Sequence, residues 1–172
     1  MTAGRPLQGL AETADRWNHV RESFDTQRSG VGAAGAAAIA LMLLGKLVLL
    51  SELIAADAHW SLWLVPIAAR TAMVPLVALL RHARTEGASQ EMNRHARPGG
   101  VVLAILIAAG ALWFIGIGQW PIVAAAFAAA GALQLWLRRR WKGLSDSSHG
   151  AAIELAELAG LVCLLLTAAG TY

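Results

Sequence analysis

Apolar stretches close to the thickness of a lipid bilayer dominate this sequence. A transmembrane helix needs about 20 mostly apolar residues, and runs near that length occupy residues 33–56, 60–80, 101–117, 120–137 and 151–169. A helix satisfies its own backbone hydrogen bonds in lipid, so each run is predicted to be α-helical. The sequence therefore predicts an all-α integral membrane protein, a helical bundle of about five transmembrane helices.

Charged residues are scarce and unevenly placed. They make up 15% of the chain, against roughly 25% in soluble domains. Most lie in residues 1–30, 81–97 and 138–157, and no polar segment is long enough to bury a core of its own. We expect a cytoplasmic amphipathic segment with an acidic motif over residues 1–30, followed by a five-helix transmembrane domain over residues 31–172. Residues 1–30 lack the apolar core of a signal peptide.

Lysine and arginine are segregated between the predicted loops. Residues 1–30, 81–100 and 138–142 hold four basic residues each, whereas the turns at 57–59 and 118–119 hold none. With five spans, the three basic segments share one face, and cytoplasmic loops carry such an excess. This predicts a multi-pass protein of the bacterial cytoplasmic (inner) membrane, with the N-terminus inside and the C-terminus outside. The net charge of +3 is interpreted as this topology signal, and no nucleic-acid partner is expected.

Four ionisable side chains lie well inside the apolar runs: Lys46, Arg70, Glu154 and Glu157. A charge at membrane depth costs roughly 3 kcal/mol, so such residues are usually paired or line a polar cavity. Arg70 is therefore expected to contact Glu154 or Glu157, directly or through water. The pairing can hold helices together and do nothing else, or it can belong to a functional site.

Two acidic pairs with i, i+3 spacing fall on the basic side of the predicted membrane. They are Glu12 with Asp15, and Glu154 with Glu157. Residues so spaced share one helix face, and two such pairs can jointly hold a divalent cation such as Mg²⁺. Either pair can equally be a set of ordinary surface or counter-ion acids. The sequence has no Walker motif, no G-x-S-x-G and no Cys/His metal spacing.

Several short segments occur in the order and spacing typical of one enzyme family. Residues 8–16 read Q-G-L-A-E-T-A-D-R, where the family has D-G-L-A-D-T-A-D-G. Residues 142–157 read K-G-L-S-D-S-S-H-G-A-A-I-E-L-A-E, close to the family's G-G-L-T-G-D-T-L-G-A-x-I-E-L-T-E. Residues 28–35, which precede Lys46, and residues 69–73 and 81–87 also match in order. The chain resembles the cobalamin synthase family, the adenosylcobinamide-GDP ribazoletransferases.

The resemblance implies a phosphotransferase that joins adenosylcobinamide-GDP to α-ribazole, or to its phosphate, and releases GMP. It implies Mg²⁺ as the cofactor, held on carboxylates, and the lipid bilayer as the surroundings. A homo-oligomer is left open. The roles carried over are catalytic for Asp15, Arg70 and Glu154; substrate-binding for Arg28, Lys46 and Ser145; and metal-binding for Glu12, Asp15, Asp146 and Glu157.

The chain departs from the family pattern at acidic positions. Gln8 and Glu12 stand where the family has aspartates, Asp15 is kept, and the acid of the last motif is shifted to Asp146. The family has further apolar segments before the first motif, so a divergent and N-terminally shortened relative is expected. The alternatives are an inactive membrane scaffold and a small transporter. Asp15 is the only aspartate kept from the family's first motif, so Asp15→Asn should abolish turnover if the chain is a functional enzyme. Because residues 1–30 are expected at the surface, the substitution should leave the fold intact.

Overall fold

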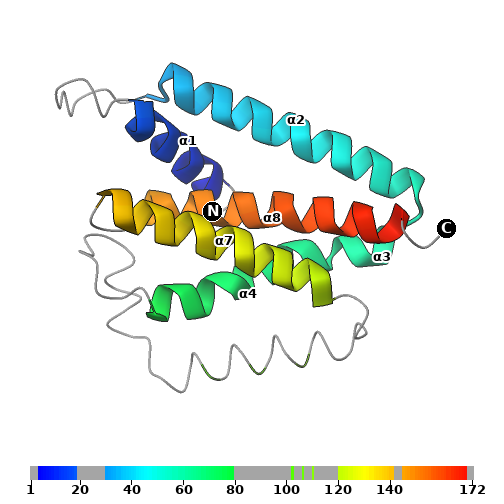
Figure 1. Cartoon of the computed structure of the whole chain (residues 1–172). Helices are drawn as coiled ribbons and strands as arrows, with labels where there is room; N and C mark the ends of the chain where they lie inside the picture. Colours follow the sequence, from blue (N-terminus) through cyan, green and yellow to red (C-terminus); the bar gives the residue numbers. More distant parts are fainter. Residues whose placement is uncertain are drawn as a thin grey trace.

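The computed structural model describes residues 4–18, 30–79, 120–141 and 145–169, with residues 102, 106 and 110. These residues form helices and no strands. The elements are α1 (Arg5–Asn18), α2 (Ala33–Ala55), α3 (His59–Leu62), α4 (Leu64–Leu79), α7 (Trp120–Trp141) and α8 (Asp146–Ala169). α8 is the central element, packed against α1, α2, α4 and α7 (Figure 1). The predicted all-α membrane bundle is confirmed.

Three helices are long and apolar enough to cross a membrane: Ala33–Ala55, Trp120–Trp141 and Ser147–Ala168. α2 turns large apolar side chains away from the rest of the bundle; Leu41, for example, is 72% exposed. Such a surface suits contact with lipid. The predicted span at 101–117 lies outside the described residues, apart from 102, 106 and 110. The number of five spans therefore stays a prediction.

The predicted span at 60–80 is divided into two helices. α3 ends at Leu62, and α4 begins at Leu64. Pro66 has no backbone N–H, so the carbonyl of Leu62 loses its helical donor, and the chain breaks at Trp63. Pro75 lies inside α4 without ending it. α4 is shorter than a full span, at 16 residues, which corresponds to about 24 Å.

Two predicted boundaries are wrong, and both helices are longer than expected. α7 continues past residue 137 to Trp141, because Arg138, Arg139 and Arg140 occupy its last turn, where cations interact favourably with the helix dipole. α8 begins at Asp146 rather than at residue 151. Residues 146–150, which precede the predicted span at 151–169, are helical.

Small side chains form the centre of the bundle. A buried cluster joins α4, α7 and α8 through alanines, including Ala69, Ala130 and Ala156, with Met73 as the large member. Alanines let helix backbones approach closely where no water is present to drive association. A second cluster of larger side chains, among them Leu53 and Ile122, lies nearer the C-terminal end of α8.

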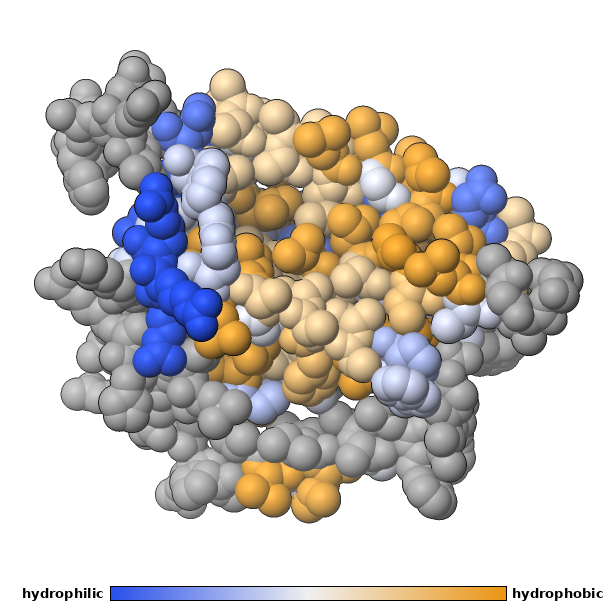
Figure 2. All heavy atoms as spheres, viewed as in Figure 1, coloured by the Kyte–Doolittle hydropathy of each residue, from blue (hydrophilic) through white to orange (hydrophobic). Residues whose placement is uncertain are grey.

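Polar residues gather at one end of the bundle. α1 lies at this end, beside the start of α2, the start of α8 and the end of α7 (Figure 1). Figure 2 shows the strongest hydrophilic colouring here, while most of the remaining described surface in that view is hydrophobic. We call this end the polar end. α1 and the last turn of α7, which are the described parts of two predicted basic segments, both lie at the polar end. This agrees with the predicted gathering of lysine and arginine on one face.

Candidate functional site

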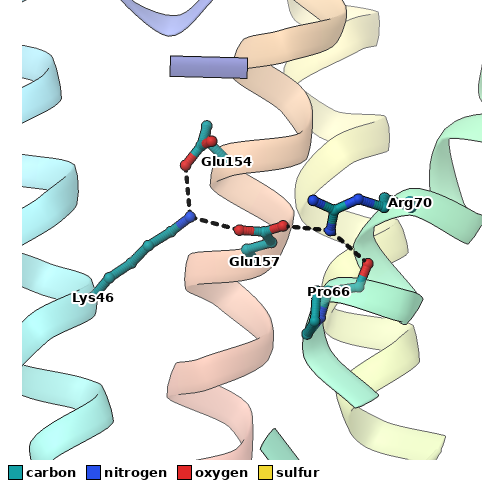
Figure 3. Close-up of polar contacts among 5 residues, drawn as sticks. All are labelled: Lys46, Pro66, Arg70, Glu154 and Glu157. Atoms are coloured by element: carbon teal, nitrogen blue, oxygen red, sulfur yellow. Dashed lines mark hydrogen bonds and ion pairs between the residues drawn. The ribbon is translucent and has the colours of Figure 1, made fainter. Parts of the chain in front are cut away.

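A network of four charged side chains links three helices in the middle of the bundle (Figure 3). Lys46 of α2 donates from Nζ to Glu154 Oε2 and to Glu157 Oε2, each at 2.6 Å. Arg70 of α4 donates from Nη1 to Glu157 Oε1 at 2.9 Å and to the Pro66 carbonyl at 3.1 Å. Glu157 thus joins both cations, and the predicted contact of Arg70 with an acid of α8 is confirmed.

The four charges of this network cancel one another. The side chains of Lys46, Glu154 and Glu157 are 16%, 8% and 16% exposed, whereas that of Arg70 is 61% exposed. Glu157 lies about 16 Å along α8 from its first residue, near the middle of the helix. Removing one partner at such a site leaves an uncompensated charge. The geometry supports a counter-ion role for Arg70.

Asp15 of α1 fastens the start of α2. Its two carboxylate oxygens accept the backbone N–H groups of Gly32 and Gly35, both at 2.7 Å. The first N–H groups of a helix lack partners within the helix and carry partial positive charge, and the N-cap residue Gly32 supplies no side chain to satisfy them. Asp15 therefore acts as a cap from a neighbouring helix.

The close fit around Asp15 explains the two glycines. A Cβ atom on Gly32 would lie 2.5 Å from Asp15 Oδ1, and one on Gly35 would lie 2.5 Å from Oδ2. The predicted catalytic and metal-binding roles of Asp15 stay predictions; its side chain, expected at the surface, is partly buried and bonded to α2. Sequence reasoning missed this role, although the G-x-x-G spacing at the start of the span offered a signal.

Glu12 connects α1 to the start of α8. It accepts a hydrogen bond from the Ser147 hydroxyl, and its other oxygen accepts from Gln8 Nε2 at 2.8 Å. Glu12 and Asp15 thus bond to the starts of two different helices. Gln8, which stands where the family has an acid, supports Glu12 in this position.

α1 crosses α8 at close range through two glycines. A Cβ on Gly9 would lie 2.6 Å from the Ser147 carbonyl oxygen and 3.0 Å from Gly150 Cα. A Cβ on Gly150 would lie 3.0 Å from the Pro6 carbonyl oxygen. Any side chain at this crossing would push the helices apart, so the glycines set the distance at which Glu12 reaches Ser147.

Ser145 caps the start of α8. The Ser148 N–H donates to Ser145 Oγ at 3.4 Å, and in return the Ser145 N–H donates to Ser148 Oγ at 3.1 Å. These local bonds compensate the unpaired backbone groups at the helix start and explain why α8 begins before residue 151. The buried Gln134 of α7 donates to the Ser148 carbonyl at 3.2 Å, which ties α7 to the same turn.

The predicted site residues fall into two separate groups. Glu12, Asp15 and Ser145 lie at the polar end, while Lys46, Arg70, Glu154 and Glu157 form the network deeper in the bundle. Ser147, the partner of Glu12, lies about 15 Å along α8 from Glu157. The backbone of Asp146 begins α8, but its side chain is not described, and Arg28 lies outside the described residues.

The carboxylates were also predicted to hold Mg²⁺. Among the described residues, no three His, Cys, Asp or Glu side chains converge as a metal centre. The oxygens of Asp15 accept backbone N–H groups, those of Glu12 bond Ser147 and Gln8, and those of Glu157 face two cations. The described carboxylates therefore do not fit a single metal centre in this arrangement, and magnesium binding stays a prediction.

Comparison with known proteins decides the family. A model of the family described as cobalamin-5-phosphate synthase matches residues 1–165. The chain belongs to the cobalamin-5-phosphate synthase family. The match includes α1, α2, α4, α7 and most of α8, so both groups of site residues lie inside it.

Curated relatives in the family share the name adenosylcobinamide-GDP ribazoletransferase. The protein of Desulforamulus reducens is 30% identical over 96% of this chain and 69% of its own length. That of Roseiflexus sp. is 32% identical over 98% of this chain and 64% of its own. That of Pseudomonas savastanoi pv. phaseolicola is 31% identical over 96% and 71%. The chain thus spans roughly two thirds of these relatives. No solved structure matches it.

Proposed function

We propose that the chain is an adenosylcobinamide-GDP ribazoletransferase. The observation that carries the proposal is the family match over residues 1–165, together with relatives of that name about 30% identical over nearly the whole chain. The reaction joins adenosylcobinamide-GDP to α-ribazole or its phosphate. A hydroxyl oxygen of α-ribazole forms a bond to the cobinamide-side phosphorus, the bond from that phosphorus to GMP breaks, and the hydroxyl proton is released.

The polar end is the proposed place of this reaction. Both substrates are water-soluble, and one of them carries a diphosphate, so they meet the protein from the aqueous side. Arg16 and the arginines that end α7 are exposed there. A surface of one charge sign raises the local concentration of an oppositely charged substrate. We place this end on the cytoplasmic side of the inner membrane, because loops of that side are rich in basic residues.

The acidic residues of α1 fix the positions of two helix starts at the polar end. Asp15 holds the start of α2, and Glu12 holds the start of α8. Substrate groups bound between these helix starts would meet a prearranged surface, and pre-arrangement is the main contribution of a protein to phosphoryl transfer. Magnesium dependence is proposed from the family resemblance alone, and no step is assigned to the metal.

The test is GMP release by the purified chain in detergent. With adenosylcobinamide-GDP and α-ribazole present, we expect GMP release that depends on both substrates and on added Mg²⁺. Omitting α-ribazole separates transfer from simple hydrolysis of the diphosphate. Release that needs no α-ribazole would contradict the transferase, and release unaffected by a metal chelator would contradict magnesium dependence.

One observation favours the scaffold alternative. Glu12 and Asp15 are both engaged in bonds that hold helix starts, and Gln8 replaces an acid of the family pattern. A well-folded chain that releases no GMP under any of these conditions would support the scaffold. The transporter alternative needs Arg70 and the two glutamates of α8 to line a polar path. In the described residues these side chains, together with Lys46, neutralise one another.

A further inference from the structure

Tryptophan and arginine side chains of α1 and α7 interlock at the polar end. The rings of Trp17 and Trp136 lie 4.6 Å apart between centroids, tilted by 32°. The guanidinium of Arg140 lies 5.8 Å from the Trp17 ring, and that of Arg16 lies 4.6 Å from the Trp141 ring. We call these five residues the tryptophan–arginine patch. Trp136 and Arg140 are four residues apart, so they lie on one face of α7.

The patch is open to the surroundings of the protein. Trp17 is 48% exposed and Trp136 46% exposed, and Arg16 and Arg140 are exposed as well. Among the described residues, no carboxylate forms an ion pair with either arginine. The nearby acids of α1 are engaged elsewhere, Glu12 with Ser147 and Asp15 with α2. Within the part of the chain that the structure describes, this surface therefore combines apolar rings with positive charge that no carboxylate pairs.

The position of the patch places it at the edge of the membrane. α7 is one of the helices long and apolar enough to span a bilayer, and the patch occupies its last two turns. Tryptophan favours the level of the lipid headgroups, because its ring is apolar and its N–H is polar. Arginines just beyond a span lie at the depth of lipid phosphates.

We infer that the tryptophan–arginine patch binds the headgroup of an anionic phospholipid. Arg140 and Arg16 would contact the phosphate, since guanidinium groups match phosphate oxygens in charge and geometry, while Trp17 and Trp136 lie against the glycerol and upper acyl chains. Two helices contribute to the patch, so a bound lipid fastens α1 to the end of α7. Arg16 and Arg140 are among the exposed arginines proposed above to attract the diphosphate substrate, so the test includes competition by GDP.

The test compares two arginines of the same turn. Arg138 is two residues before Arg140, so the two project from nearly opposite sides of α7, and both are exposed. Native mass spectrometry of the full chain in detergent would measure binding of phosphatidylglycerol and, as the neutral control, phosphatidylcholine. We expect phosphatidylglycerol to be preferred, Arg140→Gln to weaken it about fivefold, and Arg138→Gln to change it by less than about twofold. Arg16→Gln is a second variant from α1, expected to act like Arg140→Gln.

Several results would overturn the inference. Equal losses for Arg138→Gln and Arg140→Gln would indicate diffuse attraction to the basic end. Equal binding of the two lipids would exclude a headgroup site. Displacement of phosphatidylglycerol by GDP, with loss of GDP binding in Arg140→Gln, would assign the patch to a nucleotide. Thermal unfolding of each variant serves as the folding control.

Discussion

Lys46 is held between two carboxylates, and this contact shapes the interior of the bundle. Its ammonium group bonds Glu154 and Glu157 at equal distance, and Arg70 shares only the second of them. Ions taken out of water need partners of excellent geometry to offset the lost hydration. The less exposed cation, Lys46, therefore contributes more to the stability of the folded protein than the more exposed Arg70.

Lys46→Met is expected to destabilise the protein more than Arg70→Met. The first leaves Glu154 without a cation and Glu157 with Arg70 alone, at a cost of about 3 kcal/mol. The second leaves Lys46 between its two acids and removes a cation that is 61% exposed. Thermal unfolding in detergent would measure both. Equal losses of stability, or a greater loss for Arg70→Met, would contradict the larger role assigned to Lys46.

Asp15→Asn is expected to loosen the start of α2. An amide keeps one acceptor oxygen but presents its NH₂ group to a backbone N–H, and the charge at the helix N-terminus is lost, so stability falls by about 1 kcal/mol. Hydrogen exchange at the amides of Gly32 and Gly35 is the measurement, with faster exchange expected in the variant. Unchanged hydrogen exchange in the variant would mean that the Asp15 contacts contribute nothing to the stability of the start of α2.

The pairing of the buried charges was predictable, and its details were not. The cost of an isolated charge in lipid predicts that Arg70 must find an acid. The choice of Glu157 over Glu154, and the bridging position of Lys46, depend on how α2, α4 and α8 are rotated against each other. That rotation comes from the packing of alanines such as Ala69 and Ala156, which a single sequence does not reveal.

α1 is attached as an element rather than by any single bond. It touches α8 through the Gly9 and Gly150 crossing, α2 through Asp15, and α7 through Trp17. The contacts run along its length, so α1 joins the ends of three longer helices. An amphipathic segment at the surface was predicted; its buried face, with Gly9 and Ala11, shows that it packs on protein.

Gly9→Ala is expected to detach α1 without melting the spans. The added methyl would lie 2.6 Å from the Ser147 carbonyl oxygen, so it would clash with the backbone of α8 unless the helices moved apart. Trypsin cleavage after Arg16 should then become faster. Gly45→Ala is the matched control, because its Cβ would meet only Leu158 Cδ1 at 3.5 Å and alanine favours a helix by about 1 kcal/mol. Equal cleavage of the two variants would argue against the crossing.

Helix existence could be predicted better than helix ends. Apolar length identified α2, α7 and α8, while the starts and ends of helices depended on local bonds. Ser145 and Ser148 extend α8 at its start, and the Ser-x-x-Ser spacing before residue 151 is a capping signal that apolar length alone does not reveal. Pro66 offers a signal for an interruption of the predicted span at 60–80, and the structure places the break at Trp63.

At the scale of the whole molecule, the described basic side chains are concentrated at one end of the bundle. The polar end holds α1 and the arginines of α7, while the apolar surface of α2 continues away from it (Figures 1 and 2). The ends of the described helices alternate as the five-span topology requires: α2 and α8 start at the polar end, and α7 finishes there.

The topology prediction is that the N-terminus is inside and the C-terminus outside. Single cysteines introduced at Ala88 and at Thr171, in a Cys163→Ala background, should react with an impermeant reagent from opposite sides of the membrane. The reason is the basic excess of the loops, which favours the cytoplasm. Labelling of both positions from one side would contradict five spans.

Product formation tests the central claim, that this member of the family carries out the ribazole transfer. Purified chain in lipid nanodiscs would be given adenosylcobinamide-GDP and isotope-labelled α-ribazole, with the products analysed by mass spectrometry. We expect the label in adenosylcobalamin, with one GMP formed for each labelled product. The contradictory result is a folded chain that incorporates no label while the Desulforamulus reducens relative, prepared in the same way, does so.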